Sequence, residues 1–310
     1  MHKIALVGAG RVGEAAAQVL AQKDIVRELV LIGQRPGVAQ GTALDIAECA
    51  PLFGFDTRVH GSAELDAMAG ADLVIISAGR PRKPGMSRSD VLDANAPLVA
   101  EIAARAGHMA AQATLIVVTN PVDVLTHVAW KASGFARERV MGLSGALDAA
   151  RMAGFLAEES GLSHQDVRAL VIGGHGDNMV PLPRYCTISG IPIDRFLSQA
   201  AIDRVVARTK GGGAEILGLK QTSSAYAAPG AAIGAMVDAI AHDRKRVLPC
   251  VAVLAGEYGQ QDVAMGVPVI LGRQGIDRIV ELRLSADEAE QIRQSAAAIR
   301  RDLDRLRVAA

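Results

Sequence analysis

The chain has 310 residues, of which half are hydrophobic and only 3% aromatic, so its core must be built mainly from Ala, Val, Leu and Ile. A chain of this length buries a large core without disulfides or structural metals. Lys and Arg together number 33, as do Asp and Glu, which argues against a polyanion-binding surface and a nucleic-acid partner.

The three cysteines, Cys49, Cys186 and Cys250, lie far apart in the sequence and show no metal-ligand spacing. We therefore expect no metal site and free thiols in a reducing compartment. The first three residues lead straight into a strand-like segment, and no apolar run reaches transmembrane length. The sequence thus predicts a cytoplasmic protein without a membrane partner.

The first half of the chain alternates between strand-like and helix-like segments. The strand-like runs lack polar alternation, which is typical of strands that are buried on both faces of a parallel sheet. They lie at residues 3–7, 28–32, 57–60 (the weakest), 73–77 and 115–119, with helical spacing at 12–22 and 94–106. This alternation predicts right-handed βαβ units and an α/β fold of the Rossmann type, with a doubly wound parallel sheet.

The second half mixes strands with longer helices, and we expect a C-terminal α+β domain there. Its predicted elements are a strand at 167–172, a tight hairpin of 185–188 and 191–193, helices at 194–217 and 223–242, and strands at 250–254, 267–271 and 279–282. A capping box, Ser285-Ala286-Asp287-Glu288, predicts the start of a final charged surface helix. We place the domain boundary after residue 142, which gives domains of residues 1–142 and 143–310.

A glycine-rich turn follows the first strand directly and opens the first helix. Its sequence is Gly8-Ala9-Gly10-Arg11-Val12-Gly13. In this setting the first glycine permits a tight turn, the second lets the backbone approach a pyrophosphate, and the third lets helix and strand pack closely. The helix N-terminus offers free N–H groups to phosphate oxygens. We predict a dinucleotide site here, the alternative being a purely structural turn.

A second candidate segment is the arginine-rich stretch 78–88, which follows the strand-like run 73–77. It carries Arg80, Arg82, Lys83 and Arg88. Ligands of open α/β sheets bind at the carboxyl ends of the strands, and four neighbouring cations favour an anionic ligand. The alternative is a solvated basic loop.

Three further segments carry side chains of catalytic or binding type. Asn120 follows another predicted strand, where it either orients a ligand or caps a helix. Asp148 and Arg151 are three residues apart and share a helix face behind Ser144, a predicted N-cap, so that a simple intrahelical ion pair is the alternative to a binding role. His175 lies in Gly173-Gly174-His175-Gly176-Asp177, a setting that leaves its side chain sterically open and able to reach a ligand. The alternative is a histidine with only a structural role.

Taken together, these segments resemble the lactate/malate dehydrogenase family. The resemblance covers essentially the whole chain in order, through GAGRVG, ISAGRPRKPGMSR, VVTNPVD, GLSGALDAARM, GGHGDNMVPL and GGGAEI…SSAYAAPGAAI. Within the family, the stretch from Arg82 to Arg88 resembles the malate dehydrogenase form of the substrate loop, since lactate dehydrogenases usually carry Gln at the position of Arg82. The resemblance implies a dinucleotide-binding domain at 1–142, a substrate domain at 143–310, and a homo-oligomer, either a dimer or a tetramer.

The resemblance also implies a role for each candidate residue in malate/oxaloacetate interconversion. His175 would transfer the hydroxyl proton, and Asp148 would fix its tautomer. Arg88 would polarise the reacting carbonyl and bind substrate. The other substrate-binding residues would be Arg82, Asn120, Arg151 and Ser223, and cofactor contacts would come from Gly8, Gly10, Arg11, Val12, Gly13, Asn95 and Asn120.

The charge count favours a dicarboxylic substrate. Arg151 and Arg82 provide one cation for each carboxylate of malate, whereas lactate would leave Arg82 desolvated without a partner. A lactate or other 2-hydroxy acid dehydrogenase is the alternative enzyme. A non-catalytic dinucleotide-binding protein on the same fold is a third possibility, against which the proton-transfer pair His175 and Asp148 argues.

The end of the second predicted strand departs from the usual NAD pattern. NAD-binding Rossmann domains usually carry Asp or Glu there for the ribose 2′-hydroxyl, but this chain has Gly33-Gln34-Arg35. Gly33 removes the repulsion of a 2′-phosphate, and Arg35 can pair with it. We therefore expect NADP or NAD as cofactor with a preference for NADP, the alternative being an enzyme of dual specificity whose Arg35 points into solvent.

Overall fold

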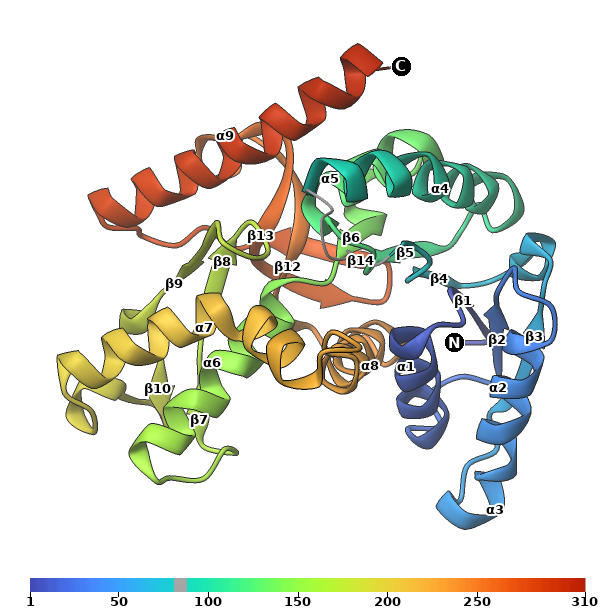
Figure 1. The fold of residues 1–310 in the computed structure, drawn as a ribbon, viewed down its shortest axis with the longest axis horizontal. Helices are drawn as coiled ribbons and strands as arrows, with labels where there is room; N and C mark the ends of the chain where they lie inside the picture. Colours follow the sequence, from blue (N-terminus) through green and yellow to red (C-terminus); the bar gives the residue numbers. More distant parts are fainter. Residues whose placement is uncertain (81–87, 310) are drawn as a thin grey trace.

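The computed structural model describes residues 1–80 and 88–309, and the side chains of residues 1–80 and 90–306. Its central feature is one mixed sheet with the strand order β3-β2-β1-β4-β5-β6-β12-β13-β8-β9, in which β14 pairs with β13. Strands from both halves of the chain therefore share a single sheet, with helices on its two faces (Figure 1). None of the helices in the described part of the chain is long and apolar enough to cross a membrane.

The strands of the large sheet are β1 (Lys3–Val7), β2 (Glu28–Ile32), β3 (Arg58–Ser62), β4 (Leu73–Ile76), β5 (Thr114–Val117), β6 (Val140–Gly142), β8 (Val171–Gly173), β9 (Met179–Pro181), β12 (Arg246–Ala255), β13 (Gln261–Gly272) and β14 (Gly275–Ile279). A small sheet holds β7 (Val167–Arg168), β10 (Thr187–Ile188) and β11 (Ile191–Pro192).

The helices are α1 (Arg11–Gln22), α2 (Val38–Glu48), α3 (Ala50–Phe53), α4 (Arg88–Met109), α5 (Val122–Ser133), α6 (Gly145–Ser160), α7 (Gln199–Lys220), α8 (Ala227–Ala241) and α9 (Ala286–Ala309).

The first six strands form the predicted doubly wound sheet. They are parallel and lie in the order β3-β2-β1-β4-β5-β6. After β1 the chain adds strands toward one edge of the sheet, and from β4 onward it adds them toward the other. Open α/β sheets bind their ligands at the carboxyl ends of the strands on either side of such a reversal, which here are β1 and β4. The strands expected at 3–7 and 28–32 are confirmed with those bounds, whereas β3 begins one residue later and ends two residues later than the weak expectation at 57–60.

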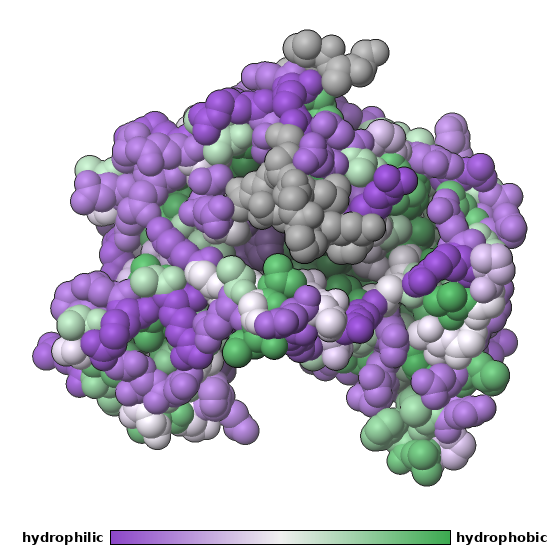
Figure 2. Space-filling view, in the orientation of Figure 1, coloured by the Kyte–Doolittle hydropathy of each residue, from purple (hydrophilic) through white to green (hydrophobic). Residues whose placement is uncertain are grey.

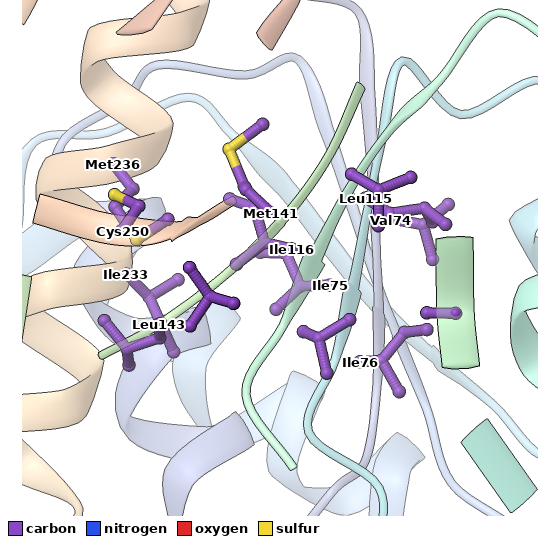
Figure 3. Close-up of a cluster of buried hydrophobic side chains, with 14 of the residues drawn as sticks. Val74, Ile75, Ile76, Leu115, Ile116, Met141, Leu143, Ile233, Met236 and Cys250 are labelled. Atoms are coloured by element: carbon purple, nitrogen blue, oxygen red, sulfur yellow. The ribbon is translucent and has the colours of Figure 1, made fainter. Parts of the chain in front are cut away.

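Strand β6 joins the two halves of the chain. It runs parallel to β5 on one side and antiparallel to β12 on the other, where Gly142 pairs with Val251. The buried side chains follow the same continuity, because a single apolar cluster includes strands β4 and β5, helix α8 and strand β12 (Figure 3). In this cluster Ile116 from the first half and Ile233 and Cys250 from the second are completely buried.

Helices α1 and α8 pack directly against each other although they come from opposite halves of the chain (Figure 1). Two glycines of α8 permit the close approach. A Cβ at Gly230 would lie 2.9 Å from the Ala15 carbonyl carbon, and one at Gly234 would overlap the Val19 side chain. The Ala-rich composition of both helices thus serves close packing, and it places the first turn of α1 beside the segment before α8.

Two expected strands in the second half are wrong in detail. The strand at 167–172 is broken, because Ala169 and Leu170 carry the chain from β7 in the small sheet to β8 in the large one. The strand expected at 279–282 lies earlier, since β14 ends at Ile279. Beyond it the Tyr258 hydroxyl donates to the Val280 carbonyl and accepts from the Leu282 N–H.

Two helices begin later than expected, whereas the hairpin and the capping box form as expected. Helix α7 begins at Gln199 because the Ser198 hydroxyl caps it by accepting from the Ala201 N–H, and α8 begins at Ala227, which leaves Ser223 outside the helix. The hairpin turn has positive φ at Ser189 and Gly190, as a two-residue turn requires. The capping box is formed by reciprocal Ser285–Glu288 bonds of 2.7 and 3.2 Å.

Candidate active site

A histidine, an aspartate and an arginine form the centre of the candidate site. The imidazole Nδ1 of His175 lies 2.8 Å from Oδ2 of Asp148, and Oδ1 of Asp148 accepts from the Arg151 guanidinium at 3.0 Å. The Asp148 side chain is 2% exposed, Arg151 11% and His175 20%. The carboxylate is therefore enclosed, while the imidazole and the guanidinium reach the edge of the solvent-accessible surface. The intrahelical ion pair expected as an alternative does form, and it is one half of this cluster.

The backbone turn around His175 is fixed from two sides. Gly173 ends β8 with φ of 82°, and Gly176 has φ of 101°, a region that glycine adopts without strain. The N–H of Gly174 donates to the Ser295 hydroxyl on α9 at 2.7 Å, and the N–H of His175 donates to Oδ2 of Asp123 on α5 at 2.8 Å. Elements that are distant in sequence thus determine where the imidazole stands.

Electrostatics favour the protonated form of His175. Burial acts to lower its pKa, but the charge and hydrogen bond of Asp148, together with the charge of Asp123, outweigh this effect and raise the pKa above the ordinary histidine value. Arg151 opposes the rise in part. An imidazole with its charged form supported by carboxylates suits proton transfer near neutral pH.

Asp123 is a site residue to which the sequence analysis assigned no role. It is 5% exposed, and burial raises the pKa of its carboxyl to about 6. The signal was present in the sequence, because Asp123 belongs to the same Thr119–Asp123 motif in which only Asn120 was given a function. Ser295 had no such signal, since it lies in the middle of a charged amphipathic helix.

Gly212 on α7 makes room for Arg151. A Cβ at this position would overlap Cδ of the arginine side chain, whereas Cβ atoms at the neighbouring Gly211 and Gly213 would meet nothing within 4 Å. The triple glycine inside a long helical pattern was the available sequence signal, since glycine costs a helix roughly 0.5–1 kcal/mol relative to alanine.

The glycine-rich turn has the geometry of a phosphate cradle. Gly8 has φ of 126° and lies against Ala78, and a Cβ at Gly13 would overlap the Gly8 carbonyl oxygen. A Cβ at Gly10, by contrast, would meet nothing within 4 Å, and the α1 N-terminus has no side-chain cap. Open space beside an uncapped helix N-terminus fits a bound pyrophosphate. The residues present therefore fit a dinucleotide, with Arg11 and Val12 in the first turn of α1.

The turn after β2 also lies at this edge of the sheet. Gly33 packs closely against the glycine-rich turn, because a Cβ there would stand 2.8 Å from that of Ala9. Gln34 and Arg35 follow it with exposed side chains. The glycine thus has a steric reason to be present, in addition to the cofactor preference suggested by its sequence context.

Two asparagines, Asn95 and Asn120, form hydrogen bonds next to the carboxyl ends of β4 and β5. Oδ1 of Asn120 accepts from the Val122 N–H at 3.3 Å, so its side chain does serve the start of α5. Asn95, 1% exposed, binds the backbone of Arg80 at 2.7 and 3.3 Å and donates to the Asn120 carbonyl at 2.9 Å. Asn95 thus lies beneath the site and ties the ends of β4 and β5 together.

Two serines have buried hydroxyls without a hydrogen-bond partner among the described residues. Ser223 lies in the segment between α7 and α8, close to Tyr226, whose ring is 5.7 Å from the Arg11 guanidinium. Ser144 is the residue before α6, as predicted, but its hydroxyl makes no capping bond. Arg82 lies outside the described residues, and of Arg88 only the backbone is described, as the first residue of α4.

The structure therefore gathers most of the predicted residues at one edge of the sheet. The glycine-rich turn follows β1, the turn of residues 33–35 follows β2, and Asn120 follows β5 (Figure 1). The α5 helix that begins two residues after Asn120 supplies the Asp123 bond to His175. His175, Asp148 and Arg151 are in direct contact, whereas the Ser223 hydroxyl makes no hydrogen bond to them or to any other described residue.

Comparisons with known proteins agree with this arrangement. Residues 2–142 match the family model of the lactate/malate dehydrogenase NAD binding domain, and residues 145–307 match that of the lactate/malate dehydrogenase alpha/beta C-terminal domain. The chain is 59% identical to a protein named malate dehydrogenase from Nitrosococcus oceani over 99% of this chain and 98% of that one, and 59% identical to one from Thioalkalivibrio sulfidiphilus over 99% and 100%.

Solved structures give the same result. A malate dehydrogenase from Salinibacter ruber superposes with a TM-score of 0.94 at 44% identity, covering 98% of this chain and 97% of that one. A lactate dehydrogenase from Cryptosporidium parvum, complexed with lactic acid and nicotinamide adenine dinucleotide, also gives 0.94, at 34% identity and 98% of both chains. On the strength of both family models and of relatives matched along nearly its full length, the chain belongs to the lactate/malate dehydrogenase family.

Proposed function

We propose that the protein is an NAD(P)-dependent malate dehydrogenase that interconverts malate and oxaloacetate. The observation that carries this proposal is the contact set of His175, Asp148 and Arg151, in which one carboxylate holds both a proton-carrying imidazole and a guanidinium. The relatives named malate dehydrogenase, at 59% identity over nearly the whole chain, support the choice of substrate.

In malate oxidation, His175 takes the hydroxyl proton on Nε2 while the C2 hydrogen leaves as hydride. The nicotinamide cofactor, when bound, supplies the hydride acceptor. Asp148 accepts from Nδ1, so it fixes the tautomer that leaves Nε2 ready to accept a proton, and it stabilises the imidazolium that forms. In oxaloacetate reduction the same imidazolium returns the proton to the oxygen on C2.

Arg151 is placed to bind the carboxylate on C1. Its guanidinium is already neutralised in part by Asp148, yet it stays 11% exposed at the edge of the cluster. The family resemblance implies that Arg82 binds the second carboxylate and that Arg88 polarises the reacting carbonyl. A pairing of two cations with two carboxylates favours malate over lactate.

A two-by-two assay tests the proposal. Oxaloacetate and pyruvate are each offered with NADH and with NADPH, and oxidation of the cofactor is followed by absorbance. We expect turnover with oxaloacetate and a much lower kcat/KM with pyruvate. A higher kcat/KM for pyruvate would instead indicate a lactate dehydrogenase, and turnover of neither keto acid with either cofactor would remove the enzymatic function altogether.

We further propose that the cofactor is NADP or NAD, with a preference for NADP. The turn after β2 offers Gly33, Gln34 and Arg35 where NAD enzymes usually place a carboxylate. An exposed guanidinium beside this turn is suited to a 2′-phosphate, which it contacts as a charge-assisted pair. In the assay above, NADPH is expected to give the higher kcat/KM with oxaloacetate.

A homo-oligomer is also proposed, as either a dimer or a tetramer. Three large apolar side chains on neighbouring helices are exposed, namely Leu44 (61%) on α2 and Leu52 (83%) and Phe53 (56%) on α3. Figure 2 shows hydrophobic surface at the tip of the molecule over α3. Apolar surface of this kind favours burial against a second copy. Light scattering coupled to gel filtration gives the mass, and a monomer would contradict the proposal.

A cytoplasmic location is consistent with the cysteines. Cys49, Cys186 and Cys250 all carry free thiols, and the last two are buried. Unpaired cysteines are typical of proteins in reducing compartments. Fractionation of cells that express the protein, with blotting of each fraction, tests this location.

A further inference from the structure

Two buried side chains hold successive N–H groups of the turn that carries His175. The Ser295 hydroxyl accepts from Gly174, and the Asp123 carboxylate accepts from His175 itself. Both acceptors are almost fully buried, at 2% and 5% exposure. A neutral hydroxyl therefore suffices as the hydrogen-bond acceptor for the Gly174 N–H, yet the acceptor for the adjacent His175 N–H is a carboxylate.

Burying a carboxylate only to accept one N–H group costs more free energy than burying a hydroxyl there. Removing a carboxylate from water disfavours its charge, and only one Asp123 oxygen is bonded, because Oδ1 is buried without a hydrogen-bond partner among the described residues. This charge is consequently not neutralised at its own position. The cationic group that faces it is the imidazolium of His175, which interacts electrostatically with Asp123.

We propose that Asp123 is a positioning residue for His175, which holds the backbone of the 173–176 turn and places a second negative charge beside the imidazolium formed during the reaction. The first carboxylate, Asp148, binds the ring and fixes its tautomer. Asp123 acts from the backbone side, so it supports the protonated histidine without touching the ring nitrogens. This inference rests on the proposed function, since only a proton-carrying His175 benefits from such a charge.

The charged groups that act on the pKa of the Asp123 carboxyl are His175 and Asp148. Burial of the Asp123 carboxyl and the charge of Asp148 raise its pKa, and the charge of His175 lowers it. Arg151 acts on His175 from the far side of Asp148. Several titratable groups on α5 and on the elements packed against it pair elsewhere: His127 and Lys131 with Asp262 of β13, Arg105 of α4 with Asp66, and Arg305 of α9 with Asp93 of α4.

Asp123→Asn tests the charge while it keeps an acceptor for the His175 N–H. An opposite charge nearby raises a histidine pKa, so we expect the apparent pKa of the proton-transfer group to fall by about one pH unit. In oxaloacetate reduction, which needs protonated His175, the alkaline limb of the kcat/KM profile then moves to lower pH, and the rate above that limb falls about tenfold. In malate oxidation the acid limb moves to lower pH by the same amount.

Ser295→Ala is the matched control. It removes the neighbouring backbone contact but no charge, so it should lower kcat with both limbs of the profile unchanged. Equal displacement of the limbs in both variants would show that Asp123 acts only through loop geometry and would overturn the inference.

A second readout does not depend on a folded Asp123 variant. NMR titration of the wild-type protein labelled with 13C-histidine, with His175→Asn to assign the resonance, should give His175 a pKa above the ordinary histidine value. A value at or below the ordinary histidine value would contradict the role of the charge. In the kinetic experiment, coinciding pH profiles of wild type and Asp123→Asn would contradict it as well. A wild-type protein that turns over neither keto acid would overturn the proposed function instead.

Discussion

Asp148 organises the site because both of its oxygens are used, one on His175 and one on Arg151. A carboxylate that is 2% exposed tolerates its charge only with such partners. The pairing links the substrate binding proposed for Arg151 to the proton transfer proposed for His175, since the charge of Arg151 acts on the His175 imidazole. The roles that the sequence assigned to these three residues are consistent with a geometry in which each contacts the next.

His175→Asn is expected to abolish proton transfer while it leaves the fold intact, because asparagine keeps the backbone bonds of the turn. The loss in kcat should be on the order of 10²–10⁴-fold, which is the usual contribution of general acid–base catalysis. Steady-state assays with oxaloacetate give the rate, and cofactor titration by fluorescence should give an unchanged Kd. Near-normal turnover in this variant would show that another group carries the proton.

Arg35→Ala is the clean test of cofactor preference. Loss of a charge-assisted phosphate contact of ~1.5–3 kcal/mol should lower kcat/KM for NADPH roughly 10- to 150-fold and leave NADH unaffected. Gly33→Asp is a less direct experiment, because a Cβ at this position would stand 2.8 Å from Ala9 and disturb the glycine-rich turn. Equal effects of Arg35→Ala on both cofactors would mean that its guanidinium does not read the phosphate.

At the scale of elements, the sequence predicted features set by a few adjacent residues and missed those set by contacts between distant parts of the chain. The glycine-rich turn, the 189–190 hairpin and the capping box at Ser285 are specified by a few adjacent residues, and all three form as expected. The break between β7 and β8 arises because one apolar segment contributes a strand to each of two different sheets. Ser295 enters the site only because α9 packs against the turn after β8, a contact that no local pattern contains.

Gly212→Ala tests whether helix α7 sets the position of Arg151. The added methyl group would overlap the arginine side chain, so the guanidinium must move away from its present place. We expect kcat/KM for oxaloacetate to fall about tenfold or more, as a charge-assisted contact is lost, with the cofactor Kd unchanged. Gly213→Ala is the control on the adjacent residue, where a Cβ meets nothing within 4 Å. Equal kinetics for the two variants would separate α7 from substrate binding.

For the molecule as a whole, the two halves of the chain are expected to unfold together, since they share one sheet and one apolar core. Gly234→Ala tests this coupling at the α1–α8 contact. The methyl group would overlap Val19, and overpacking of this kind typically costs 1–3 kcal/mol, or a few degrees in Tm.

The measurement is guanidinium unfolding followed both by circular dichroism and by the fluorescence of Trp130, the single tryptophan, which lies in the first half. Both signals should shift to the same lower midpoint. Gly154→Ala, inside α6 with no atom within 4 Å of the new Cβ, should instead stabilise by about 0.4–1 kcal/mol. Two separate transitions would show that the halves are independent units.

The shared sheet also has a consequence for synthesis of the chain. Gly142 of β6 pairs with Val251, so its partner emerges from the ribosome 109 residues later. At about 5–20 residues per second, the apolar edge formed by Val140 and Met141 waits roughly 5–20 s for β12. An open strand edge invites pairing with another nascent chain, and charged flanking residues oppose it. Arg137, Glu138 and Arg139 directly precede this strand, and they place such charges where the unfinished protein is most exposed to aggregation.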